Sequence, residues 1–129
     1  MNLKTVKKIV EETLPKIEHY YGLSKFHHRF PLVDYQTSIY GRLSGEEDDG
    51  TMGEQSPDAE YCSIGNIMFI YYPNMKSKKH IIETLIHEYQ HYLQSPSWMK
   101  RYYNMGYTYD NHPYELSALK EEKNYKLFT

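Results

Sequence analysis

Residues 84–94 read TLIHEYQHYLQ and lie within the most regular helical pattern of the chain. Apolar residues recur around them at the three- and four-residue spacing of an amphipathic helix: Ile81, Ile82, Leu85, Ile86, Tyr89 and Leu93. Ser77 is a favourable N-cap, and Pro96 prevents the helix from continuing. The pattern therefore predicts a helix over residues 77–94.

This helix contains the pattern H-E-x-x-H, from His87 to His91. Two histidines four residues apart lie on the same helix face, so both imidazoles can reach one metal ion. Zinc accepts histidine nitrogen at about 2.0–2.1 Å, and a catalytic zinc takes three protein ligands and a water. Glu88 lies about 100° further round the helix, where it can face that water as a general base without binding the metal.

A third ligand is available in the segment Asn111-His112-Pro113-Tyr114-Glu115. Proline is favoured in a first helical turn, so a last helix is expected to begin near residues 111–113 and to run to about Tyr125. Glu115 would then occupy its first turn, and Ala118 would allow close approach to the preceding helix.

On these residues the chain resembles the gluzincins, the zinc peptidases typified by thermolysin, and most closely the very small proteins called minigluzincins. The resemblance covers roughly residues 61–122, and its specific part is 84–94 with 112–118. It implies a zincin-like fold, one zinc per chain bound by His87, His91 and Glu115, and Glu88 as the base of a peptide-bond hydrolysis. It also implies a substrate extended along an edge strand, for which residues 61–72 are nominated.

The sequence departs from that family pattern at two places. His112 stands where asparagine is more frequent, and it could cap the helix, contact substrate or compete as a ligand. Leu119 occupies the position of an aspartate that orients a zinc-bound histidine, so that orienting partner must come from elsewhere. Glu121 and Glu122 are expected to be solvated. Tyr107, Tyr109, His112 and Tyr114 could each donate a hydrogen bond to a developing oxyanion.

The rest of the chain predicts an α+β fold with a small twisted sheet of three or four strands. Residues 3–21 have helical periodicity, and Pro15 predicts a kink or two shorter helices. Two short strands are expected near residues 30–35 and 38–43, and the strongest strand over 61–72, which ends at Pro73. Residues 97–110 are expected to form an irregular, aromatic connection.

Composition narrows the function classes. With 129 residues, 40% of them hydrophobic, the chain is expected to form a single domain over 1–129. The net charge of −2 gives no general attraction to nucleic acid, and no apolar run has the length of a membrane span. The single Cys62 excludes an internal disulfide, and with no secretory signal at the start it favours a cytoplasmic location. Residues 44–60 predict a mobile acidic loop, which could favour basic peptides.

Four alternatives stay open at this point. The chain could bind zinc yet hydrolyse little, with a groove that holds a partner in a binding or regulatory role. It could be latent, with the N-terminal helix or the tail 123–129 lying in the cleft. A DNA-associated peptidase of the SprT-like kind would use a third histidine, for which His112 is the candidate, although the basic segments of such proteins are missing. A protein with a coincidental motif would bind no zinc. The oligomeric state is not predicted.

Overall fold

The computed structural model describes residues 1–45 and 56–129, so most of the predicted acidic loop lies outside the described residues. The fold is mixed α+β, as expected, with a three-stranded sheet. Along the chain the elements are α1 (Leu3–Tyr21), β1 (Leu32–Gln36), α2 (Ile39–Ser44), β2 (Ala59–Cys62), β3 (Ile67–Tyr71), the 3-10 turn η2 (Tyr72–Asn74), α3 (Lys78–Leu93), α4 (Pro96–Asn104), α5 (Pro113–Glu121) and the 3-10 segment η3 (Glu122–Phe128). Within the described part of the chain, no helix is both long and apolar enough to cross a membrane.

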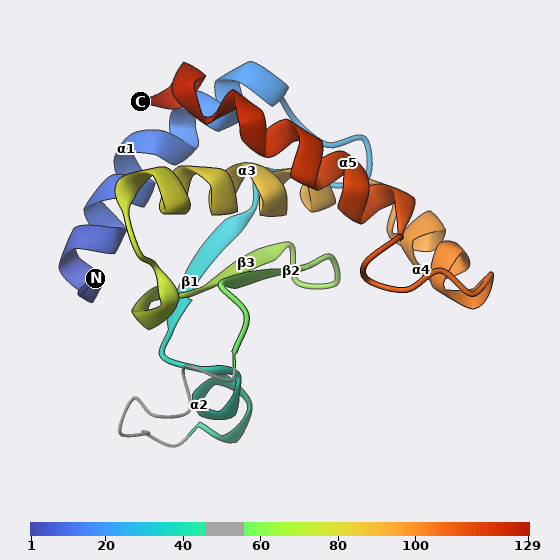
Figure 1. Ribbon diagram of the computed structural model, residues 1–129, viewed down its shortest axis with the longest axis horizontal. Helices are drawn as coiled ribbons and strands as arrows, with labels where there is room; N and C mark the ends of the chain where they lie inside the picture. Colours follow the sequence, from blue (N-terminus) through green and yellow to red (C-terminus); the bar gives the residue numbers. More distant parts are fainter. Residues whose placement is uncertain (46–55) are drawn as a thin grey trace.

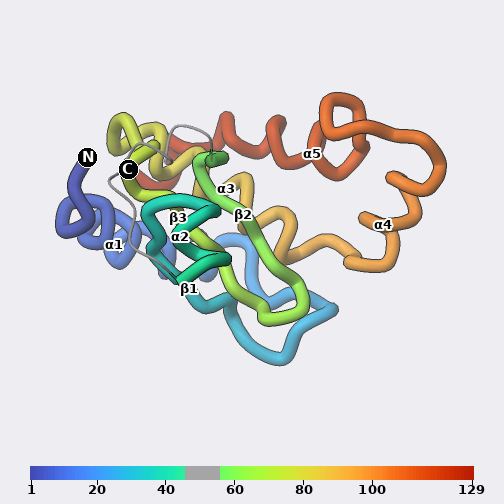
Figure 2. Tube along the Cα trace, turned by 90° about the horizontal axis from the view of Figure 1, so that it is seen from below, coloured from blue at the N-terminus to red at the C-terminus, as the bar shows by residue number. Residues whose placement is uncertain are grey.

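The sheet has the order β1-β3-β2, with β1 parallel and β2 antiparallel to the central β3 (Figure 1). Helices α1, α3 and α5 lie on one side of this sheet, and α2 lies on the other (Figure 1). The core between sheet and helices is formed by buried apolar side chains, among them Val10, Ile17, Met68, Ile70, Ile82, Leu85, Ile86 and Tyr89. Both chain termini lie at the end of the molecule opposite α4, as Figures 1 and 2 show.

Helix α1 corrects the expectation of two shorter helices, because residues 3–21 form a single helix that continues through Pro15. A proline inside a helix removes one main-chain hydrogen bond and crowds the preceding turn. Pro15 is exposed, so water can solvate the carbonyl group that loses its donor, while Leu14 and Ile17 keep the opposite face buried.

Two strand predictions are also wrong in part. The first predicted strand is present as β1, but residues 39–44 form the helix α2, which Ser38 caps by accepting a hydrogen bond from the Gly41 N–H. The predicted strand 61–72 is a hairpin, because β2 and β3 are separated by residues 63–66. Asn66 has a φ of 54°, a left-handed conformation that asparagine tolerates better than most residues. This turn makes β2 a short edge strand.

Residues 97–104 are part of helix α4, which corrects the expected irregular connection for that part, whereas residues 105–110 form no helix. Ser95 accepts a hydrogen bond from the Trp98 N–H, and Pro96 occupies the first turn, so the proline that stops α3 also begins α4. Helix α5 begins at Pro113 as predicted, but the regular helix ends at Glu121 and the chain continues as η3.

Candidate metal centre

Helix α3 carries three of the candidate site residues, His87, Glu88 and His91. Its start agrees with the prediction, since Ser77 caps it by accepting a hydrogen bond from the His80 N–H. Its core-facing residues Ile82, Ile86 and Tyr89 are completely buried, which fixes the rotation of the helix about its axis. The two histidines therefore face away from the core, toward α5.

Helix α5 brings Glu115 to these histidines. His112 caps α5 by accepting a hydrogen bond from the Tyr114 N–H, and Pro113 occupies the first turn. Ala118 is completely buried, so it allows the close contact between α5 and α3 that its small size predicts. Glu115, in the first turn of α5, is itself buried, with 6% of its surface exposed.

The donor atoms of His87, His91 and Glu115 form a tight group. Nε2 of His87 lies 3.0 Å from one carboxylate oxygen of Glu115, and Nε2 of His91 lies 3.0 Å from the other. The two Nε2 atoms are 3.3 Å apart. Tetrahedral ligands at about 2.0–2.1 Å from a common ion are roughly 3.3 Å from one another. These three residues, which also meet the spacing of a ligand group, could hold a metal ion.

Each histidine is oriented by a second partner on its other ring nitrogen. Nδ1 of His87 lies 2.9 Å from a carboxylate oxygen of Glu122, and Nδ1 of His91 lies 2.8 Å from Oε1 of Gln94. Such partners fix the ring orientation and the tautomer of a metal-binding histidine, leaving Nε2 for the ion. Gln94 is held in turn, because its Nε2 donates to the carbonyl of Tyr114.

Glu122 corrects the expectation that this residue is solvated. It supplies the orienting carboxylate that Leu119 cannot supply. The missed signal is its spacing, since Glu122 follows Glu115 by seven residues, or two helical turns, and so returns to the same side. The position one turn after Glu115 is Leu119, which has no carboxylate, and the residue two turns after it was expected to be solvated.

The carboxylates control the protonation of this group. Burial lowers the pKa of His87, but hydrogen bonds to Glu115 and Glu122 outweigh it and raise that pKa to about 10. Burial also opposes the charge of Glu115, yet hydrogen bonds from His87 and His91 lower its pKa to about 2. Without a metal ion, a proton on His87 therefore balances the negative charge of the carboxylates. A bound cation would displace this proton.

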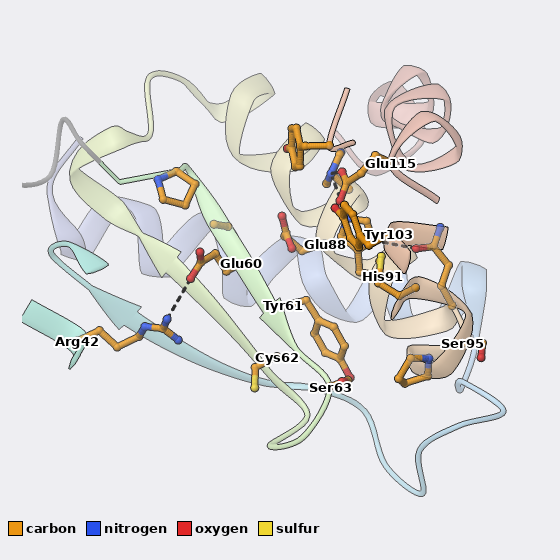
Figure 3. Close-up of a pocket in the computed structure, with 17 residues that line it drawn as sticks. Arg42, Glu60, Tyr61, Cys62, Ser63, Glu88, His91, Ser95, Tyr103 and Glu115 are labelled. Carbon is orange, nitrogen blue, oxygen red and sulfur yellow. Dashed lines mark hydrogen bonds and ion pairs between the residues drawn. The ribbon is translucent and has the colours of Figure 1, made fainter. Parts of the chain in front are cut away.

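Glu88 lies beside this group without belonging to it. Its side chain is 8% exposed, and burial is the main cause that raises the pKa of its carboxyl group. Figure 3 shows Glu88, His91 and Glu115 entering the same space between β2 and the two helices. The arrangement therefore combines three ligand atoms with a separate, buried carboxyl group.

A cleft runs past the metal centre. A cavity of about 540 Å³ lies on one side and one of about 230 Å³ on the other, and both are bordered by Ala59, His87, Glu88 and Tyr109. The first cavity extends along β2 to Ser63 and along α4 to Tyr103. The edge strand β2, which shares residues 61 and 62 with the nominated segment 61–72, therefore borders the cleft.

The four aromatic candidates for oxyanion stabilisation occupy different places. Tyr109 borders both cavities, whereas Tyr107 and Tyr114 border neither. His112 is completely buried, with Nδ1 accepting from the Tyr114 N–H and Nε2 donating to the carbonyl of Met99 at 3.0 Å. It is therefore a helix cap, and it is not part of the ligand group. Tyr103 borders the cleft, and sequence analysis missed it because residues 97–110 gave no helix prediction.

The segments proposed to make the protein latent lie elsewhere. In the part of the chain that the structure describes, no residue of α1 and none of the tail 123–129 borders either cavity. The tail packs on α3 and α1, where Phe128 joins the core and contacts the ring of Tyr20. The cleft is therefore not covered by these two segments.

Comparison of the chain with protein-family models, with curated proteins and with solved structures gives no match in any of the three. The function is therefore argued from the geometry of the site.

Proposed function

We propose that this protein is a zinc-dependent peptide hydrolase of the gluzincin type. The observation that carries the proposal is the convergence of Nε2 of His87, Nε2 of His91 and the carboxylate of Glu115, with the separate carboxyl group of Glu88 beside them. Two imidazole nitrogens 3.3 Å apart suit zinc when a carboxylate has one oxygen 3.0 Å from each of them. Three protein ligands leave a position for water.

The residues around the ion would divide the chemistry between them. Zinc, when bound, would polarise the substrate carbonyl and make water more acidic. Glu88 would accept the proton of the attacking water and pass it to the nitrogen of the leaving amine. Tyr109, which borders both halves of the cleft, is the candidate donor to the oxygen that becomes negative. Glu122 and Gln94 would keep the histidine rings oriented.

The main chain of β2 supports a peptide as the substrate. The Tyr71 N–H donates to the carbonyl of Asp58, next to the ladder pair of Ala59 and Ile70, so residues 58 and 71 are a bonded position. Because bonded and non-bonded pairs alternate in an antiparallel ladder, the main-chain groups of Ala59 and Tyr61 point away from β3. Ala59 and Tyr61 both border the cleft, where an extended peptide could pair with these main-chain groups as an added strand.

The test begins with the metal content of untagged protein, measured by elemental analysis. We expect about one zinc per chain in the wild type and in Glu88→Gln, and loss of zinc in His91→Ala. Glu88→Gln should fail to cut a peptide mixture that the wild type cuts. Glu83→Gln is the matched control, because Glu83 lies on the same helix and borders neither cavity.

Two outcomes separate the alternatives. Zinc in the wild type without any cleavage would favour the binding or regulatory role and contradict hydrolysis. No zinc in any form, even after incubation with the metal, would contradict the whole proposal and leave a coincidental motif.

A further inference from the structure

Apolar side chains are exposed at the edge of the molecule where the loop 22–31 meets the turn between β2 and β3. The side-chain amide of Asn66, in this turn, donates to the carbonyls of Arg29 and Phe30 in the loop. Figure 2 accordingly shows the loop and the turn side by side at one edge. The large apolar side chains that are exposed there are Phe26, Phe30, Leu32 and Ile64, which together we call the edge patch.

The main chain beneath the edge patch is held by buried polar contacts. The hydroxyl of Tyr61 donates to Oδ1 of Asn66 at 2.7 Å, and Nε2 of His27 lies 2.9 Å from the same hydroxyl. Tyr92 of α3 is completely buried, and its hydroxyl donates to the carbonyl of Arg29 at 2.9 Å. These contacts fix the loop and the turn to the sheet and to α3, so the apolar side chains stay on the surface.

The same edge is positively charged. Residues 22–33 contain basic side chains and no acidic one, and the basic residues are Lys25, His27, His28 and Arg29. Lys25 and Arg29 are exposed, and neither belongs to an ion pair within the part of the chain that the structure describes. The turn residues 63–66 are uncharged. The edge therefore combines unpaired positive charge with apolar side chains, although the chain as a whole has a net charge of −2.

The shape of the edge patch restricts the kind of partner. None of its side chains borders either of the two cavities, and Ile64 is 98% exposed, so the patch projects from the molecule. A second copy of the chain fits poorly, because a symmetric contact would bring Lys25 and Arg29 against the same cations of the copy. A nucleic acid would match the charge, but its phosphates and sugars give no apolar contact to the projecting side chains.

We propose that the edge patch binds the surface of a membrane that contains anionic lipids. The apolar side chains, with Ile64 foremost, enter the boundary between head groups and acyl chains, while Lys25 and Arg29 contact the anionic head groups. Attachment of this kind gains from apolar area and from charge together, and the edge supplies both. The surface lies outside the metal centre, so this inference does not rest on the proposed function.

The test measures sedimentation of the full chain with vesicles of phosphatidylcholine, alone or mixed with phosphatidylserine. We expect binding at least about tenfold tighter to the mixed vesicles, because each cation near an anionic surface contributes a factor of about five. Lys25→Gln should therefore weaken this binding by about fivefold. Ile64→Ser should weaken it by about fivefold or more, because it removes the most exposed apolar side chain of the edge patch.

Lys7→Gln and Leu127→Ser are the matched controls for charge and for apolar surface. Both residues are exposed, and they lie on α1 and η3, close to the chain termini that Figure 2 shows away from this edge. Both variants should bind the mixed vesicles like the wild type.

Insertion into the lipid is measured with an environment-sensitive fluorophore on a single cysteine. The label is attached to Ile64→Cys or to Leu127→Cys, each in Cys62→Ser protein, because Cys62 is the only natural cysteine. The mixed vesicles should move the label at residue 64, and not the label at residue 127, into an apolar environment. An unchanged signal at residue 64 would contradict insertion.

Three further results would overturn the inference: no binding to the mixed vesicles, equal binding to both kinds of vesicle, or wild-type binding in Ile64→Ser. Binding of a short duplex DNA in place of the vesicles would assign the edge to nucleic acid and would overturn it as well. All of these measurements are made without zinc and without a peptide substrate. Their failure therefore leaves the proposed hydrolysis intact, and failure of hydrolysis leaves the membrane contact intact.

Discussion

The two histidines of the metal centre are oriented by contacts of different range and charge. His91 is held by Gln94, a neutral amide only three residues away that follows the end of α3. His87 is held by the carboxylate of Glu122, which is 35 residues away on η3. One side of the centre therefore depends on local chain geometry, whereas the other depends on the packing of the C-terminal segment against α3. Glu115 joins both sides, with one oxygen for each histidine.

The largest effect is expected from removing the residue that joins the two sides. If the proposed function holds, Glu115→Ala removes one of three ligands, so it should weaken zinc binding by more than the factor of about 10–100 that is typical of an orienting partner. Competition with a chelator of known affinity measures this. Ser117→Ala, an exposed residue of the same helix, should bind zinc like the wild type. Wild-type affinity in Glu115→Ala would remove this carboxylate from the ligand set.

The two sides should differ when their orienting partners are removed. Glu122→Ala should lower zinc affinity by about 10–100-fold, and Gln94→Ala by less, because a hydrogen bond to an ionised group is roughly twice as strong as a neutral one. Both affinities are measured by the same competition, with Lys123→Ala as an exposed neighbour that should have no effect. A larger loss in Gln94→Ala would mean that the local contact is the dominant one.

The protonation of His87 predicts that stability depends on pH in opposite directions with and without metal. The folded pKa of His87 is about 10, above the usual value of 6.5, so its contribution to metal-free stability is complete below about pH 6.5 and is lost as the pH rises toward 10. Zinc binding requires a neutral histidine, so the stabilisation by zinc should increase over the same range. Thermal unfolding between pH 6.5 and 9, with chelator and with zinc, measures both. If stability changed with pH in the same way with chelator and with zinc, His87 would not be protonated in the metal-free protein.

The smallest effect is expected from the anchor of the C-terminal segment. Tyr21 on α1 donates a hydrogen bond to Glu121 at 2.8 Å, and burial raises the pKa of its phenol to about 12, so it remains a donor at neutral pH. Tyr21→Phe should cost about 0.5–1.5 kcal/mol of unfolding free energy. Its effect on zinc affinity should be smaller than that of Glu122→Ala. Tyr20→Phe, at the exposed neighbouring residue, is the control for chemical denaturation. Equal loss in both variants would show that the anchor contributes nothing.

Local patterns were sufficient for the centre of the site. Because His87 and His91 are four residues apart, they lie on the same helix face. Pro113 fixes the start of the helix that carries Glu115. Local patterns gave the wrong secondary structure where the same residues were compatible with two structures. Pro96 both ends α3 and begins α4, and the β-prone residues 39–43 became helical under the Ser38 cap. The turn at Asn66, which divides the predicted strand 61–72, was overlooked.

Helical periodicity and helix starts are local properties, so the sequence was enough to predict helix α3, the shared face of His87 and His91, and the carboxylate of Glu115 as the third member of the group. The partner that orients His87 and the surfaces that border the group depend instead on tertiary packing. Glu122 reaches His87 because η3 packs on α3, and His112 turns inward because Met99 offers its carbonyl. These contacts join residues 13 to 35 positions apart, so they depend on how whole elements pack against each other, which no local spacing determines.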